Sequence, residues 1–150
     1  MLRRDRGLLV ALLIAGLVLV ACSRSTSQEV LGAEAPPVTV EKIEGSDLKR
    51  VTLIPGSAER LGIEAVPVRS EVVRGVSRMV MPYAALLYDE AGNTWTYTNP
   101  EGLAFVRHSV TVDRIEGDLA VLSDGPPAGT MVVTVGAAEL YGAEFGVGGN

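Results

Sequence analysis

The sequence has little of what most enzyme active sites require. It contains one cysteine, one histidine, one tryptophan and 5 % aromatic residues. The histidine, His108, stands beside Ser109, and neighbouring residues of a strand point to opposite faces, so the two cannot pair as base and nucleophile. Zinc sites need three or four cysteine, histidine or carboxylate ligands. We therefore expect no enzyme, no metal and no bound cofactor, with His108 at a strand surface; a ligand or switch role is the alternative.

The chain also lacks an excess of positive charge. It has 13 lysines and arginines against 18 acidic residues. Without Arg3, Arg4, Arg6 and Asp5 the counts become 10 and 17, a net charge of −7. This balance argues against a nucleic-acid partner and against direct adsorption of the whole body to anionic lipid.

No hydrophobic run is long enough for a typical membrane span, which needs roughly 20 apolar residues. Residues 7–20 hold 14 uncharged residues after a basic start, which is typical of the core of a signal peptide. The run ends in Leu19-Val20-Ala21-Cys22, which resembles the lipobox of bacterial lipoproteins. That resemblance implies cleavage before Cys22 and a diacylglycerol, with palmitate, on its sulfur. An uncleaved membrane anchor and plain secretion are the alternatives.

The polar stretch after Cys22 is rich in small residues and ends in Pro36-Pro37, a composition typical of a flexible linker. We therefore predict a signal peptide at 1–21, a lipidated tether at 22–37, a β-rich domain at 38–145 and a disordered tail at 146–150. An ordered N-terminal arm is the alternative for the tether. The expected location is the extracytoplasmic face of the bacterial cell membrane.

Short alternating segments, with turn residues every 8–12 positions, predict an all-β domain in the form of a small barrel or sandwich with one or two short helices. We expect turns at 89–93, 99–102 and 116–118, and a single strand over 104–112. Gly75 predicts a bend or bulge within one long strand. Ser57 is expected to cap one short helix, and Gly142 to end the other.

The order of several segments from Pro82 onward resembles a known family. These segments are Ala84-Ala85-Leu86, the aromatic strand "TWTYT", residues 105–112 and "GPPAGTMVVTVGAAEL". They are similar to the barrel-end and membrane-proximal part of periplasmic adaptor (membrane fusion) proteins of the HlyD type. Only 13 residues separate Val68 from Pro82, which leaves no room for the lipoyl-like domain or helical hairpin of a full adaptor. The resemblance implies a reduced, lipid-anchored adaptor.

The function implied by the resemblance is docking on a membrane efflux or export transporter of the RND or ABC type. We predict the partner contacts to be turn residues: Asp89, Asn93, Asn99 and Glu101. The alternative is a small ligand- or soft-metal-binding lipoprotein.

Two residue groups bear on that alternative. Met79 and Met81 share a strand face, and thioethers can hold Cu(I) or Ag(I); filling of the core is the competing interpretation. Tyr83, Trp95 and Tyr97 raise the further option of a carbohydrate or peptide platform, against packing in the core.

Overall fold

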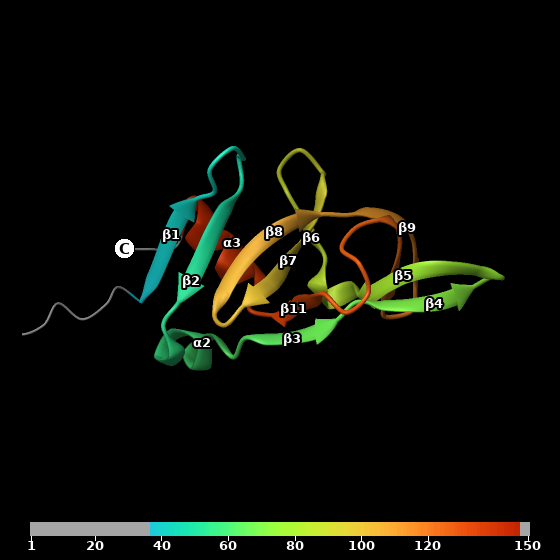
Figure 1. The fold of residues 1–150 in the computed structure, drawn as a ribbon, viewed down its shortest axis with the longest axis horizontal. Coiled ribbons are helices and arrows are strands. Elements are labelled where there is room, and N and C mark those ends of the chain that lie inside the picture. The colour runs from blue at the N-terminus through green and yellow to red at the C-terminus, as the bar shows by residue number, and fades with distance from the viewer. Residues whose placement is uncertain (1–36, 148–150) are drawn as a thin grey trace, which may run out of the picture. The chain divides into compact units, whose positions relative to one another are not determined.

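The computed structural model describes residues 37–147, which belong to a compact unit running from Ala35 to Asn150 (Figure 1). The predicted signal peptide, Cys22, the tether up to residue 36 and the tail from residue 148 lie outside the described residues. The described part is mostly strand with two short α-helices, so the predicted all-β class is confirmed. Its two sheets are open, which corresponds to the sandwich rather than the barrel.

The larger sheet, called sheet A here, has the order β1-β2-β8-β7-β11-β3. The short strand β6 lies outside this order and also pairs with β7. The smaller sheet, sheet B, has the order β4-β5-β10-β9. All the strand pairs are antiparallel. The strands of sheet A are Val38–Lys42 (β1), Lys49–Leu53 (β2), Glu64–Pro67 (β3), Leu87–Tyr88 (β6), Thr94–Glu101 (β7), Ala104–Ser109 (β8) and Met131–Val135 (β11). Those of sheet B are Arg69–Val73 (β4), Val76–Pro82 (β5), Thr111–Glu116 (β9) and Leu119–Asp124 (β10).

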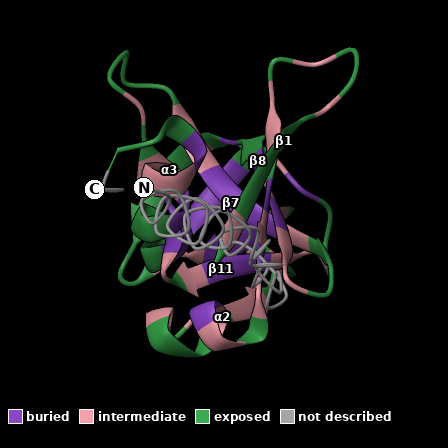
Figure 2. Cartoon of the chain, turned by 90° about the vertical axis from the view of Figure 1, so that its left-hand side faces the viewer, coloured by how far each residue is buried: buried purple, intermediate pink, exposed green. Residues whose placement is uncertain are grey.

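Three helical segments complete the unit: α2 (Pro55–Leu61), the 3-10 turn η1 (Tyr83–Ala85) and α3 (Ala137–Phe145). One core cluster, which includes Tyr97, Phe105 and Leu140, packs α3 against sheet A. Figure 2 shows that the central strands β7, β8 and β11 contain buried residues. Burying this apolar surface is the main stabilising contribution available to a chain without a disulfide.

A second core cluster lies where the chain passes from one sheet to the other. Val68 links β3 to β4 and Val110 links β8 to β9, and both side chains are buried in this cluster. The Val68 amide donates to the carbonyl of Thr130 at 2.8 Å, and the Val110 amide donates to that of Thr94 at 3.0 Å. The predicted single strand over 104–112 is therefore two strands in different sheets, joined at Val110.

The predicted bend at Gly75 is wrong. Arg74 and Gly75 form the tip of a hairpin between β4 and β5, with φ angles of 53° and 82°. Two successive residues with positive φ form a tight turn whose twist matches that of the flanking strands. The two β-branched segments around Gly75 therefore pair with each other instead of continuing as one strand.

Two helix-end predictions also fail. Ser57 lies inside α2, buried, where its hydroxyl accepts from Nη2 of Arg60 at 3.0 Å, and the N-cap position is Ile54. The α3 helix continues through Gly142 to Phe145 and ends at Gly146, whose φ is 70°. The turn predicted at 99–102 is displaced as well, because β7 extends to Glu101 and the chain reverses at Gly102 and Leu103.

Candidate partner-binding surface

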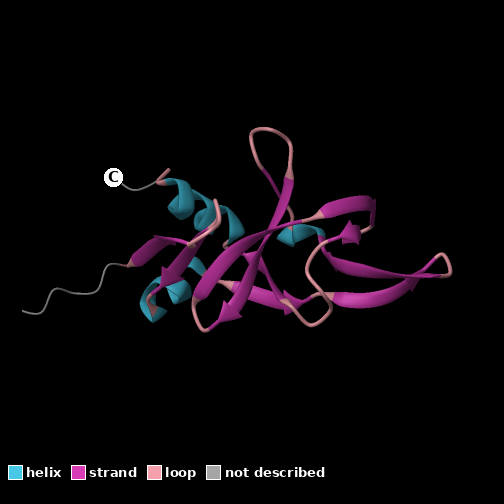
Figure 3. Cartoon of the chain, turned by 45° about the horizontal axis from the view of Figure 1, so that its top comes forward, coloured by secondary structure: helices cyan, strands magenta, loops and turns pink. Residues whose placement is uncertain are grey.

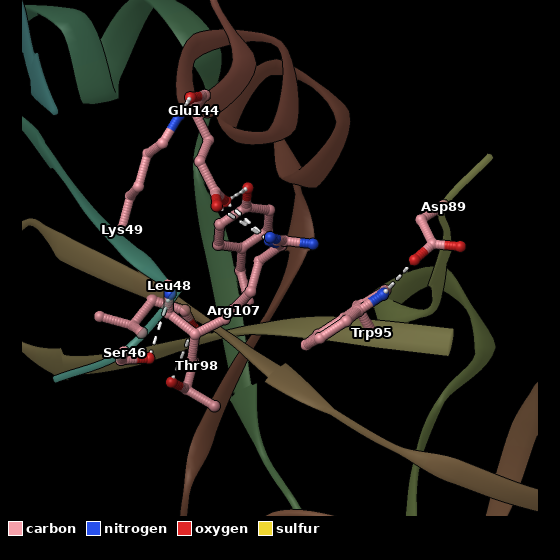
Figure 4. Close-up of polar contacts among 10 residues, drawn as sticks. Ser46, Leu48, Lys49, Asp89, Trp95, Thr98, Arg107 and Glu144 are labelled. Atoms are coloured by element: carbon pink, nitrogen blue, oxygen red, sulfur yellow. Dashed lines mark hydrogen bonds and ion pairs between the residues drawn. The ribbon is translucent and has the colours of Figure 1, made fainter. Parts of the chain in front are cut away.

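A buried polar cluster joins α3 to sheet A (Figure 4). The carboxylate of Glu144 accepts from the hydroxyl of Tyr97 at 2.5 Å and from Nε of Arg107 at 3.0 and 2.9 Å. Tyr97 is fully buried, and the other two residues are 2 % and 8 % exposed. We call these three residues the Glu144 cluster. Burial, followed by the hydrogen bond to Glu144, raises the pKa of Tyr97 well above its usual value.

Aromatic rings enclose the cation of this cluster. Cζ of Arg107 lies 4.5 Å from the centroid of the Trp95 ring and 4.8 Å from that of Phe145. Lys49 donates from Nζ to the backbone carbonyl of Glu144 at 2.8 Å. Charged groups that are paired and stacked in this way hold two elements together. We interpret the Glu144 cluster as the structural link between α3 and the sheet.

The loop between β6 and β7 is organised around Asp89. The Asp89 carboxylate accepts from the backbone amides of Ala91 and Asn93 at 3.0 and 2.8 Å and from Nδ2 of Asn93 at 2.8 Å. It also accepts from Nε1 of Trp95 at 3.0 Å (Figure 4). These hydrogen bonds, led by those from the Asn93 and Trp95 side chains, lower the pKa of Asp89 to about 2. The Asp89 carboxylate therefore fixes the shape of the loop, because its oxygens accept hydrogen bonds from the loop itself and from Trp95 at the start of β7.

The four predicted contact residues lie in two places along the chain. Asn93 lies in the same loop, whereas Asn99 and Glu101 lie near the far end of β7. The eight residue steps from Asn93 to Glu101 correspond to roughly 26 Å of strand. Nδ2 of Asn99 donates to the carbonyls of Gly102 and Ala104, both at 2.9 Å, and so orders the β7–β8 turn. The four residues therefore lie in two separate places, and Asn99 and Glu101 are strand residues; contact of any of the four with a partner stays a prediction.

The exposed surface beside the Asp89 loop carries two tyrosines. Tyr83 on η1 is 46 % exposed, and Tyr88 on β6 is 56 % exposed. The pKa of Tyr88 is raised, first by desolvation and then by the neighbouring Tyr83 side chain. Glu90, in the adjoining loop, is also exposed. We call Tyr83, Tyr88 and Glu90 the tyrosine face.

Of the two interpretations of Tyr83, Trp95 and Tyr97, packing fits Tyr97 and Trp95, and the platform does not. Tyr97 is fully buried, Trp95 is half-buried against Arg107, and only Tyr83 is substantially exposed. Tyr88, its exposed neighbour, was missed; its position directly before the predicted 89–93 turn was the available signal.

The two methionines lie in the core cluster between the sheets. Met81 is 1 % exposed and belongs to that cluster, and the half-buried Met79 packs against it. His108 is exposed on β8, with Nδ1 2.8 Å from the backbone oxygen of Ser109. Within residues 37–147, no group of three histidine, cysteine or carboxylate side chains is placed to hold a metal ion.

Among the helices of the described region, none combines the length and the apolar character of a membrane span. None of the family models, curated proteins or solved structures compared with the chain matches it.

Proposed function

We propose that the protein is a lipid-anchored, non-catalytic accessory protein that docks on a membrane efflux or export transporter from the extracytoplasmic side. The lipobox-like residues ending at Cys22 and the sequence resemblance to periplasmic adaptors support this proposal. The lipid on Cys22 would hold the domain at the membrane, and the segment that follows would set its distance from it.

The tyrosine face is the observation that carries the docking proposal. Tyrosine is enriched in protein–protein interfaces, where its ring contributes contact area and its hydroxyl contributes hydrogen bonds. Tyr83 and Tyr88 are exposed next to a loop that the Asp89 carboxylate holds through four donors. A surface already held in one conformation loses little conformational entropy on binding. The tyrosine face therefore meets the physical requirements of a docking site.

The soft-metal alternative has less support. A Cu(I) or Ag(I) site on Met79 and Met81 would require their thioethers to leave apolar neighbours such as Leu122 and Val110. Removing buried side chains from a core creates cavities and costs stability. The contacts of both methionines favour filling of the core.

The experiment is recovery of transporter subunits with the tagged full-length protein from detergent extracts, measured by quantitative mass spectrometry. The variants are wild type, Tyr83→Ala/Tyr88→Ala and the control Val135→Ala, which truncates a 44 % exposed side chain at the end of β11. We expect wild type and control to recover the same transporter and the double variant to recover much less. Recovery of no transporter by wild type, or equal recovery by all three, contradicts the proposal.

A further inference from the structure

The β4–β5 hairpin exposes apolar side chains beside its tip. Val72 is 77 % exposed, more than any other large hydrophobic residue reported for the described region, and Val76 is 51 % exposed. Arg74 and Gly75 make the turn between them. Farther along β5, Val80 and Met81 are each 1 % exposed, so the buried part of the hairpin begins several residues from the tip. The tip half of the hairpin extends beyond the core (Figures 1 and 3).

The net charge of this hairpin is opposite in sign to the net charge of the whole chain. Residues 69–78 contain Arg69, Arg74, Arg78 and one acidic residue, Glu71, a net charge of +2, whereas the chain carries −5. Arg69 pairs with Glu71 at 3.4 Å, and Arg74 pairs with Glu116 at 3.6 Å. These side chains are 39–76 % exposed, and ion pairs between exposed groups are weak. The arginines therefore remain available to another anion.

We propose that the tip of the β4–β5 hairpin inserts into the interface of an anionic membrane. Val72 and Val76 would enter the boundary between headgroups and acyl chains, and the arginines would contact lipid phosphates. Apolar side chains flanked by cationic ones are the combination that binds this interface, since arginine can keep its stem in apolar surroundings and its charge in the headgroup layer. The net charge of −7 argues against adsorption of the whole domain, but residues 69–78 of the hairpin carry +2.

A tether makes such a weak contact effective. Binding becomes intramolecular once the domain is held at the surface, so a contact that is weak in solution is populated at the membrane. The hairpin tip lies at the opposite end of the described unit from the start of β1 (Figure 1). The 15 residues 22–36 can span about 50 Å at most, and a domain of about 110 residues has a radius of gyration of about 13 Å. The extended tether is therefore several times longer than that radius, which favours an anchor at residue 22 together with a contact at the hairpin tip.

The test replaces the natural anchor, so it does not depend on acylation of Cys22 or on a transporter. The protein used is a chain of residues 23–150, which contains both core clusters, with a histidine tag at its N-terminus. The tag attaches it to nickel-chelating lipid in vesicles of phosphatidylcholine with phosphatidylglycerol. This chain has no cysteine, so Val72→Cys gives one site for an environment-sensitive fluorophore. The matched control is Val135→Cys with the same label, at a position that is also exposed.

We expect the emission of the fluorophore at position 72 to shift to the blue on vesicles and to be quenched by spin-labelled lipid. The fluorophore at position 135 should keep the emission spectrum that it has in water. Adding Val76→Asp, or exchanging Arg69, Arg74 and Arg78 for glutamine, should abolish or reduce the shift. An unshifted label at position 72 overturns the proposal. Equal shifts at positions 72 and 135 overturn it as well, and so does a shift that survives Val76→Asp, because the dye itself would then be the inserting group.

Discussion

Nε of Arg107 on β8 lies 3.0 and 2.9 Å from the two carboxylate oxygens of Glu144 on α3, 37 residues further along the chain. The side chains are 9 % and 1 % exposed. The same guanidinium lies over the rings of Trp95 and Phe145, and Trp95 in turn donates to Asp89. One connected set of contacts therefore runs from α3, through sheet A, to the loop beside the tyrosine face (Figure 4).

Removing the cation of this pair should destabilise the fold strongly. Arg107→Ala leaves the Glu144 carboxylate buried without its ionic partner, and breaking a buried pair in this way costs about 3–5 kcal/mol. Urea unfolding followed by circular dichroism measures the change. The control is Arg114→Ala, which removes partly exposed ion pairs with Asp113 and Glu116, and such pairs contribute about 0–1 kcal/mol. Similar losses in the two variants would show that the Arg107 contacts are not what fixes α3.

Tyr97 should make the stability of the fold sensitive to alkaline pH. Its folded-state pKa is raised above the unfolded value of about 10. The stabilisation associated with this shift is therefore fully present below about pH 10 and lost as the pH rises above it, because only the unfolded chain then ionises Tyr97. The measurement is the urea midpoint at about pH 7 and about pH 11.

Tyr97→Phe tests the same side chain by deletion of its hydroxyl. The variant loses a hydrogen bond to a charged group, which contributes about 1.5–3 kcal/mol near neutral pH. It should then lose less additional stability than the wild type between neutral and alkaline pH. An identical alkaline loss in both proteins would rule out Tyr97 as the titrating group.

Asp89 should hold its loop down to unusually low pH. Its folded pKa of about 2 lies below the unfolded value of about 3.9, so its contribution is present above about pH 4 and is lost as the pH falls through about 2. Trp95 is the only tryptophan, so its indole N–H gives one NMR signal that reports the bond to Asp89. We expect this signal to titrate with a midpoint near 2. A midpoint near 4 would contradict the hydrogen-bonding pattern, and Asp89→Asn should remove the titration.

Two glycines with nearly equal φ angles allow the cost of backbone strain to be distinguished from the cost of side-chain crowding. Gly129 and Gly136 have φ angles of 89° and 87°. A side chain at either costs about 1–2 kcal/mol for the left-handed conformation. A Cβ at Gly129 meets no atom within 4 Å, whereas a Cβ at Gly136 lies 2.2 Å from Cδ1 of Ile63. Gly136→Ala should therefore destabilise more than Gly129→Ala in thermal unfolding, and equal losses would mean that Ile63 moves aside without cost.

The strand pattern of the sequence predicts the fold class well because alternation and turn residues are local signals. The hairpin turn around Asp89 and the turn at 116–118 lie where expected. The division of residues 104–116 between two sheets was not predicted. Val110 continues the apolar alternation, and only the strand pairing shows the change of sheet, because β8 pairs with β7 whereas β9 pairs with β10.

The Glu144 cluster was missed for a similar reason. Arg107 lies two residues after the buried Phe105, so the strand period places it on the inward face, but nothing in the sequence names a partner 37 residues away. The roles of Asp89 and Asn99 in shaping their turns were not predicted either, because the sequence does not show which groups a turn side chain contacts. Their side chains make the hydrogen bonds that shape the turns.

Cys22→Ser tests the proposed anchor separately from the folded unit. Without the thiol no diacylglycerol can be attached, so the variant should lose incorporation of radiolabelled palmitate and keep its signal peptide. A control substitution two residues later, Arg24→Ala, should leave both unchanged. Continued cleavage and membrane association of the Cys22→Ser chain would show that the anchor is elsewhere.

The most direct test of the account is photo-crosslinking in intact cells. A photoreactive phenylalanine replaces Tyr88 in one variant and Val135 in another, and both of these side chains are exposed. Docking through the tyrosine face predicts that the probe at position 88 captures a subunit of a membrane transporter and the probe at position 135 does not. If the two probes capture the same proteins, or if position 88 captures no membrane transporter, the tyrosine face is not the docking site.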